Sequence, residues 1–134
     1  AEGYIRTGDF ANAAALIDVY RTRNGLPSVA GINDLTTPVP GGNACVPRIP
    51  VGPSFTTTAC GNILEAMKYE KRLETAYTTY GAWFFDSRGW GDLPAGTGLD
   101  FAVPYQDLQV RLRPIYSKGG GTLPASAPRG TYGF

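Results

Sequence analysis

Apolar positions recur every three or four residues between Phe10 and Tyr20, and this spacing predicts a helix with one apolar face. Asp9 stands before the helix as an N-cap, and Gly25 follows the expected last residue, Asn24, as a stop. The members of the apolar face are Phe10, Ala13, Ala14, Ile17 and Tyr20.

The first residues of the chain, Ala1 to Arg6, have the pattern of the end of a helix, which Thr7 and Gly8 would turn into the next one. Two helices joined by a Gly-containing turn, with small residues at packing positions, are typical of tetratricopeptide repeats. An ordinary helical hairpin packed on a core fits the same pattern, because one hairpin is visible and a repeat array needs about three to be stable. Since the helical pattern is already under way at Ala1, we expect the chain to be a piece of a longer protein.

The longest helical pattern extends from Asn62 to Tyr80 and predicts the main helix of the fold. Asn62 is a good N-cap, Glu65 completes a capping box, and Gly81 is the expected end. The apolar face consists of Ile63, Ala66, Met67, Leu73, Ala76, Tyr77 and Tyr80. Glu70 falls within this stripe, where a buried carboxylate needs a cation or hydrogen bonds.

The rest of the chain is rich in Gly, Pro and Thr, which predicts loops. Residues 26–61 show no sustained period, so we expect one long irregular connection there. A short helical turn is expected at 106–112, and residues 117–134 have the composition of a flexible tail or of a segment that orders against a partner. The predicted fold class is mainly α: a helical hairpin and one long helix with long loops. Residues 1–134 would form a single domain or a C-terminal fragment.

Cys45 and Cys60 are expected to anchor the long connection. A disulfide between them would close a loop of about 15 residues, worth roughly 3 kcal/mol of stability. Two buried thiols are the alternative, but both cysteines stand among polar, turn-forming residues, which favours the disulfide. A disulfide would indicate an oxidising compartment.

Composition argues against several classes of function. The net charge is only +1, whereas nucleic-acid or anionic-membrane binding needs clustered Lys and Arg. No apolar run approaches the roughly 20 residues of a membrane-spanning helix. The chain has no histidine, and its two cysteines cannot form a structural zinc site unaided. We expect neither a metal nor a cofactor.

Candidate catalytic groups are few. Glu70 and Glu74 lie one helical turn apart, and glycosidases use paired carboxylates. With Lys71 and Arg72 beside them, a structural ion-pair network is the better interpretation. Ser87 is rejected as a nucleophile, because the chain has no histidine to activate it.

Further charged residues are assigned structural roles. Asp86 and Arg88 are expected to pair and fix the turn after the main helix. Arg88 and Arg72 are also the candidate partners of Glu70, and the sequence does not choose between them. Three aspartates could ligate calcium but lack EF-hand spacing; they are Asp34, Asp92 and Asp100.

Aromatic side chains are the candidates for outside contact, because aromatic faces stack on sugars and anchor protein interfaces. Trp83 lies in an apolar run and is expected in the core. Trp90 stands between two glycines, where it could contact a ligand or partner, or cover the local core; the second interpretation is favoured. Tyr80 and Tyr105 complete the candidate binding residues.

Three stretches carry a family resemblance through their order along the chain. The first is GDFANAAALIDVYRTRNGLP. The second has the charged residues Glu70, Arg72 and Glu74, followed by Trp83, Phe84, Asp86 and Arg88, and the third is VPYQDLQ, with Pro104 and Asp107. Together they resemble the C-terminal part of SusD/RagB-family proteins, in which the first stretch closes a tetratricopeptide-like scaffold.

Proteins of this family are outer-membrane lipoproteins of Gram-negative bacteria that bind nutrients, chiefly glycans, for a TonB-dependent transporter. The resemblance implies a non-enzymatic glycan-binding protein beside such a transporter, in the periplasm or at the outer-membrane surface of the cell envelope. A structural or accessory subunit of a larger envelope or membrane complex, docking through its helices, loop and tail, is the alternative. A glycoside hydrolase is the weakest interpretation, because no acid/base pair can be named.

Overall fold

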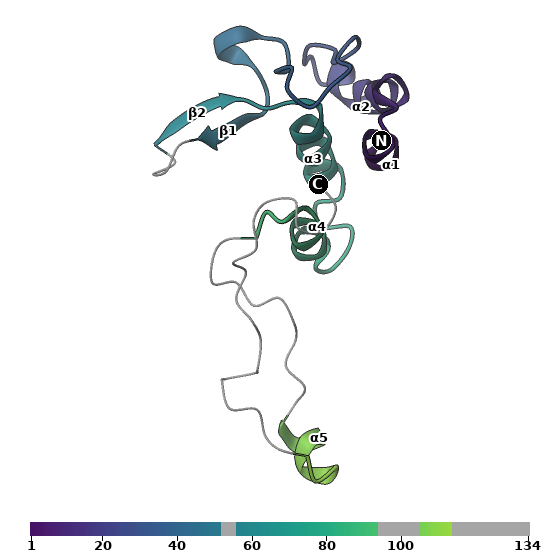
Figure 1. The fold of residues 1–134 in the computed structure, drawn as a ribbon, viewed down its shortest axis with the longest axis vertical. Helices are drawn as coiled ribbons and strands as arrows, with labels where there is room; N and C mark the ends of the chain where they lie inside the picture. The colour runs from purple at the N-terminus through teal and green to yellow at the C-terminus, as the bar shows by residue number, and fades with distance from the viewer. Residues whose placement is uncertain (52–55, 94–104, 114–134) are drawn as a thin grey trace. The chain divides into compact units, whose positions relative to one another are not determined.

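The computed structural model of the chain describes residues 1–51, 56–93 and 105–113. Within them the elements follow in the order α1 (Glu2–Arg6), α2 (Phe10–Arg23), the 3-10 turn η1 (Gly42–Ala44), β1 (Arg48–Val51), β2 (Thr57–Cys60), α3 (Ile63–Glu74), α4 (Ala82–Trp90) and α5 (Tyr105–Val110) (Figure 1). The chain divides into two compact units, residues 1–80 and 81–134, which are described separately. Helices dominate the described residues, as predicted, but an antiparallel hairpin makes the fold mixed rather than purely helical.

α1 and α2 form the predicted helical hairpin of the first unit. Asp9 caps α2, since its carboxylate accepts a hydrogen bond from the Asn12 amide at 3.2 Å. Gly8 turns the chain after α1 with a φ of +80°, and Gly25 does the same after α2 with a φ of +75°. Glycine adopts this left-handed conformation without the strain that a Cβ would cause. The predicted cap and stop of α2 are therefore confirmed.

The long connection is not irregular throughout. β1 and β2 pair antiparallel, with Arg48 opposite Cys60, so the prediction of one structureless segment at 26–61 is wrong. Each strand has four residues, which is too few to show an alternating pattern in the sequence, and β1 contains Pro50, which argues against a strand when the sequence is read alone. The hairpin is held to the rest of the unit by the disulfide described below.

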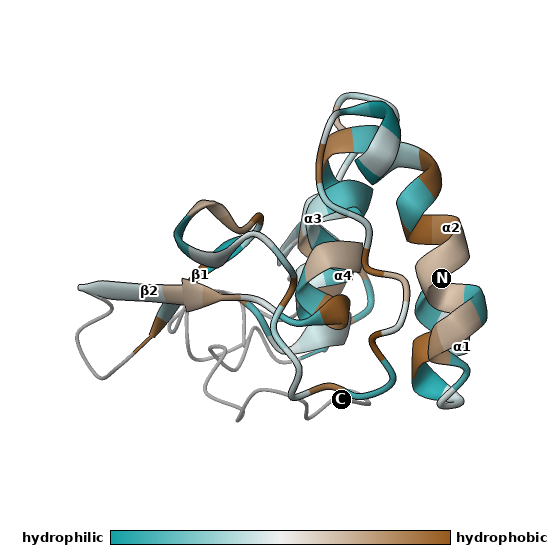
Figure 2. Cartoon of the chain, turned by 90° about the horizontal axis from the view of Figure 1, so that it is seen from above, coloured by the Kyte–Doolittle hydropathy of each residue, from teal (hydrophilic) through white to brown (hydrophobic). Residues whose placement is uncertain are grey.

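The core of the first unit lies between α1, α2, α3 and the loops that follow α2. Its members are Ile5, Ala13, Ala14, Ile17, Val29, Ile32, Val39, Ile63, Leu64, Ala66 and Met67, all at most 8% exposed. α3 enters this core from the predicted cap, because Asn62 accepts a hydrogen bond from the Glu65 amide at 3.1 Å. Figure 2 shows that hydrophobic and hydrophilic positions are interspersed along α2.

The end of α3 differs from the prediction, because the helix stops at Glu74 rather than continuing to Tyr80. The Thr75 hydroxyl donates to a carbonyl of the last turn at 2.7 Å, and Tyr77 takes a left-handed φ of +62°. Such side-chain bonds compete with the helix for backbone groups, and Thr and Tyr are weak helix formers. Leu73, Tyr77 and Tyr80, which the pattern assigned to the apolar face, are 55, 107 and 101% exposed.

In the second unit, α4 is a helix that the sequence pattern did not predict. Gly81 begins it with a φ of +78°, and Gly91 ends it with a φ of +73°. Ser87 and Trp90 are buried, but Trp83 is 54% exposed, so its predicted place in the core is wrong. Consecutive residues of a helix point in different directions, so a run such as AWFF cannot bury every member.

α5 confirms the short helix expected near 106–112, although it begins at Tyr105 and ends at Val110. It carries an ion pair between Asp107 and Arg111 at 3.0 Å.

The expected tail at 117–134 lies outside the described residues, as do Asp100 and Pro104. No helix in the described part of the chain is long and apolar enough to cross a membrane.

Candidate functional site

The first unit contains a pocket of about 470 Å³ between its three helices, which we call the α1–α3 groove. Glu2 contributes from α1, and the chain on either side of the helices adds Ala1 and Thr75. α2 contributes Leu16, Ile17, Val19 and Tyr20, and α3 contributes Met67, Glu70, Lys71 and Glu74. The groove therefore has an apolar wall from α2 and a largely charged wall from α3, and α1 adds a third carboxylate.

Helical spacing explains which side chains line the groove. The four α3 residues fall at intervals of three and four, so they form one stripe along the helix. On α2, Ile17 belongs to the buried face, while Leu16 and Val19 lie beside it and remain 47 and 58% exposed. α2 thus carries apolar side chains on more sides than a single buried stripe requires.

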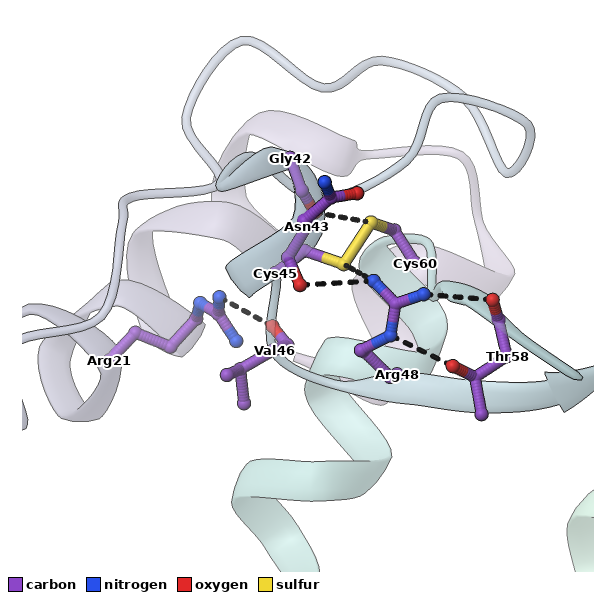
Figure 3. Close-up of a disulfide and its surroundings, with 8 residues drawn as sticks. All are labelled: Arg21, Gly42, Asn43, Cys45, Val46, Arg48, Thr58 and Cys60. Carbon is purple, nitrogen blue, oxygen red and sulfur yellow. Dashed lines mark hydrogen bonds between the residues drawn. A yellow bond between two sulfur atoms is a disulfide. The ribbon is translucent and has the colours of Figure 1, made fainter.

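The electrostatic centre behind the groove is Arg21, which has no exposed surface. Its guanidinium donates to the carbonyl oxygens of Pro27 at 3.2 Å and Val46 at 2.8 Å, and pairs with a carboxylate oxygen of Glu70 at 3.4 Å (Figure 3 shows the Val46 bond). Arg21 is therefore the cation that acts on Glu70. The sequence had nominated Arg72 and Arg88, and missed Arg21 because the two partners are 49 residues apart.

The Glu70 carboxyl is buried, and this burial raises its pKa above the ordinary value of 4.5. The positive charge of Arg21 and its hydrogen bond lower the pKa, and the negative charge of Glu74 raises it again. Burial outweighs the ion pair, so the charge of Glu70 is only partly compensated in the folded protein.

The other charges of the groove are unevenly paired. Glu2 accepts from Arg6 at 3.0 Å and from Lys71 at 3.4 Å, which joins α1 to α3. Within the described residues, the Glu74 carboxylate has no hydrogen-bond or ion-pair partner. Glu70 is therefore paired, with a cation other than the predicted ones, and the described residues supply no partner for Glu74.

A second buried ion pair stabilises α3 at its start. Lys68 is 1% exposed, and its ammonium donates to the Glu65 carboxylate at 3.2 Å. Residues three apart in a helix are neighbours, so this pair forms within one element. Neither side chain lines the groove.

The predicted disulfide between Cys45 and Cys60 is confirmed, with an S–S distance of 2.01 Å. Arg48 lies against it, 3.6 Å from the Cys45 sulfur, and donates to the Asn43 carbonyl at 3.2 Å (Figure 3). The same guanidinium binds the Thr58 carbonyl at 2.8 Å, across the hairpin. The disulfide and Arg48 together fasten the hairpin to the loop that supplies a carbonyl to Arg21.

Most of the remaining predicted site residues belong to the second unit, and Tyr80 is the last residue of the first. Trp90 is only 1% exposed, which supports its role in the local core and removes its ring from outside contact. Tyr80 and Tyr105 are exposed, as a binding role would require, but neither lines the groove. Asp86 and Arg88 lie inside α4 and not in a turn after the main helix.

The candidate calcium ligands are occupied by other contacts or lie elsewhere. Asp34 accepts bonds from the amides and hydroxyls of Thr36 and Thr37, and these bonds lower its pKa to about 2. Asp92 lies in the second unit, just after α4. The part of the chain that the structure describes contains no group of three potential metal ligands.

The α1–α3 groove offers a binding partner apolar surface to pack against and carboxylates that accept hydrogen bonds. Ser87, the rejected nucleophile, is buried, and its hydroxyl has no hydrogen-bond partner among the described residues. The chain matches no protein-family model, and no curated protein or solved structure is found to be similar to it.

Proposed function

We propose that the chain is a non-enzymatic docking module of a larger cell-envelope assembly, and that it docks through the α1–α3 groove. The observation that carries this proposal is the exposure of Leu16 and Val19, at 47 and 58%, beside a pocket of about 470 Å³. Neighbouring apolar side chains that stay in water next to a concave surface are typical of an interface.

Two further observations support the proposed location in the cell envelope and the proposed kind of partner. The disulfide between Cys45 and Cys60 suits an oxidising compartment such as the periplasm. The resemblance to the SusD/RagB family supports a TonB-dependent transporter or another membrane-complex subunit as the partner. In the same proposal the α1–α2 hairpin has a tetratricopeptide-like role, because such hairpins bury their exposed faces against neighbouring helices.

Glycan binding, as in nutrient uptake, is the second candidate function. It is favoured by the combination of an aromatic ring, Tyr20, with the carboxylates of Glu70 and Glu74 in one groove. Rings stack on sugar faces and carboxylates accept from hydroxyls. The apolar wall that α2 supplies favours a protein partner over a sugar, so we place this function second.

The test compares two leucines that are about half exposed on neighbouring helices. Leu16 lines the groove and Leu73 does not, at 47 and 55% exposure. In gently solubilised cell envelopes we expect the wild type and Leu73→Ser to migrate in a stable multi-subunit assembly and Leu16→Ser to lose it. Migration of the wild type as a 14.3 kDa monomer would exclude the docking function.

A glycan panel measured by calorimetry tests the second candidate on the same material. Binding of a glycan that Tyr20→Ala weakens and Leu73→Ser leaves unchanged would move glycan binding to first place. No heat from any glycan, together with a Leu16-dependent assembly, would leave docking as the function.

A further inference from the structure

The α1–α3 groove has an apolar wall on its α2 side and, on its α3 side, a carboxylate that no cation of the described residues pairs with. Leu16 and Val19 stand opposite the stripe that ends in Glu74. An occupant must therefore combine aliphatic surface with a group that a carboxylate attracts.

The charges of the groove define that group. Three carboxylates and one ammonium side chain line it, with the amino group of Ala1 beside them, and the ammonium, Lys71, is held by Glu2 at 3.4 Å. Arg21 lies behind Glu70 and is also bound to two carbonyls. Glu74 has no partner among the described residues and repels the charge of Glu70. A cation entering the groove would interact favourably with both carboxylates, whereas an anion would be repelled by both.

The backbone around the groove restricts the form of a peptide occupant. The three elements that line it are helices, so the groove has no strand edge, and the backbone groups left open lie only at the helix ends near Glu2 and Glu74. An extended peptide would find no strand edge there and would leave its own backbone groups unpaired against the apolar wall. A helix satisfies its backbone internally and can lay an apolar face into such a groove.

From these observations we propose that the α1–α3 groove binds a helical segment of a partner protein that places a Lys or Arg between aliphatic residues one turn away on either side. The cation lies against Glu74 and Glu70, and the aliphatic residues pack on Leu16 and Val19. This inference rests on the proposed docking function and names the chemistry of its partner.

The test uses three synthetic helical peptides of about 15 residues, the length at which an isolated helix begins to be stable. Each carries one leucine-rich face, and the central residue of that face is Lys, Gln or Glu. Binding to the whole oxidised chain is measured by fluorescence anisotropy at low salt. We expect the Lys peptide to bind about fivefold more tightly than the Gln peptide, with the Glu peptide weakest.

Two variants that each neutralise one carboxylate test which carboxylate causes the preference for the Lys peptide. Glu74→Gln should remove most of the preference for Lys over Gln, whereas Asp107→Asn, which neutralises an exposed carboxylate on α5, should leave the preference unchanged. Circular dichroism of each variant checks that the fold is retained.

Each other outcome is decisive. Equal affinity for the three peptides, with Leu16→Ser weakening all of them, would overturn the cation preference and leave the docking function intact. A preference for Lys that survives Glu74→Gln would place the cation elsewhere and overturn the proposal. Failure of all three peptides to bind would overturn it too, while the assembly test with Leu16→Ser would still decide the docking function by itself.

Discussion

Arg21 is a charged side chain with no exposed surface, and it joins α2 to two loops and to α3. Removing a guanidinium from water is costly, and the ion pair with Glu70 offsets this cost only because two carbonyls complete the donor set. A residue of this kind stabilises the fold as part of a complete set of contacts. Loss of one member leaves the others buried and unsatisfied.

We therefore predict that Arg21→Met lowers the free energy of unfolding by about 3–5 kcal/mol, since it leaves the Glu70 charge and two carbonyls without their donor. Urea denaturation measures the loss. The control is Arg6→Met, which removes the partly exposed pair with Glu2 and should cost about 0.5 kcal/mol or less. Adding Glu70→Leu to Arg21→Met should recover part of the loss. Equal costs for the two arginine variants would contradict the role assigned to Arg21.

The raised pKa of Glu70 predicts a pH-dependent difference between the wild type and Glu70→Gln. The contribution of this carboxyl to stability is complete below its ordinary pKa of 4.5 and is lost as pH rises through the raised folded value. On acidification from neutral pH towards that window, the wild type should gain stability relative to Glu70→Gln. Urea denaturation of both proteins at several pH values measures the difference.

The carboxyl of Asp34 has the opposite pH dependence. The pKa of Asp34 is lowered to about 2, so its contribution is present above 3.8 and is lost only at lower pH, equally in both proteins. Glu74 also acts on Glu70, so the comparison is repeated with Glu74→Gln in both backgrounds. A difference that stays constant, or that turns against the wild type as pH falls, would contradict the raised pKa.

At the scale of the elements, three helices end in the same backbone conformation. After α1, α2 and α4 a glycine takes a positive φ, at Gly8, Gly25 and Gly91. The amide that follows each glycine bonds a carbonyl five residues back, at 2.8 Å in all three cases. This is the Schellman arrangement, and it satisfies carbonyls that the last helical turn leaves over.

Two glycines with open space around them should respond oppositely to alanine. Gly25 has a φ of +75°, so Gly25→Ala strains the backbone and should cost about 1 kcal/mol. Gly89 lies in α4 with no positive φ and nothing within 4 Å of an added Cβ, so Gly89→Ala should stabilise by about 0.5–1 kcal/mol. Thermal unfolding of both variants measures the signs. The same sign at both positions would contradict the assigned conformations.

The elements could be predicted from the sequence where local signals act alone. The cap at Asp9 and the stop at Gly25 are such signals, and both were predicted. The end of α3 was not, because the hydroxyl of Thr75 competes with the helix in a stretch whose pattern still looks helical. α4 was missed because Gly81 has the signature of a helix end and here begins the next helix.

At the scale of the whole molecule, the boundary between the two units falls in the chain segment after α3, where Tyr77 and Tyr80 are fully exposed. We predict that a protease specific for aromatic residues, at low dose, cuts the described part of the chain first after Tyr77 or Tyr80. Exposed aromatic residues inside helices are protected until the helix opens. Mass spectrometry identifies the first product, and Tyr77→Thr with Tyr80→Thr should suppress it. A first cut within α2 or α3 would contradict the two-unit description.

The groove was only partly visible in the sequence for a reason that belongs to the whole fold. Glu70 and Glu74 could be singled out because they are one turn apart on one helix. Arg21, Leu16 and Val19 could not be assigned to them, since α2 and α3 are joined by the long connection and meet only through tertiary packing. The pairing of two distant helices depends on this packing, which a local pattern does not encode.

The bond from Arg21 to the Val46 carbonyl has a consequence for local unfolding. The disulfide loop cannot open at Val46 without withdrawing an acceptor from the guanidinium that holds Glu70. Loop, α2 and α3 therefore open together, and their amides should exchange hydrogen with solvent at a common free energy. The connection at 26–61, whose composition predicts an irregular loop, thus unfolds cooperatively with the helices that line the groove.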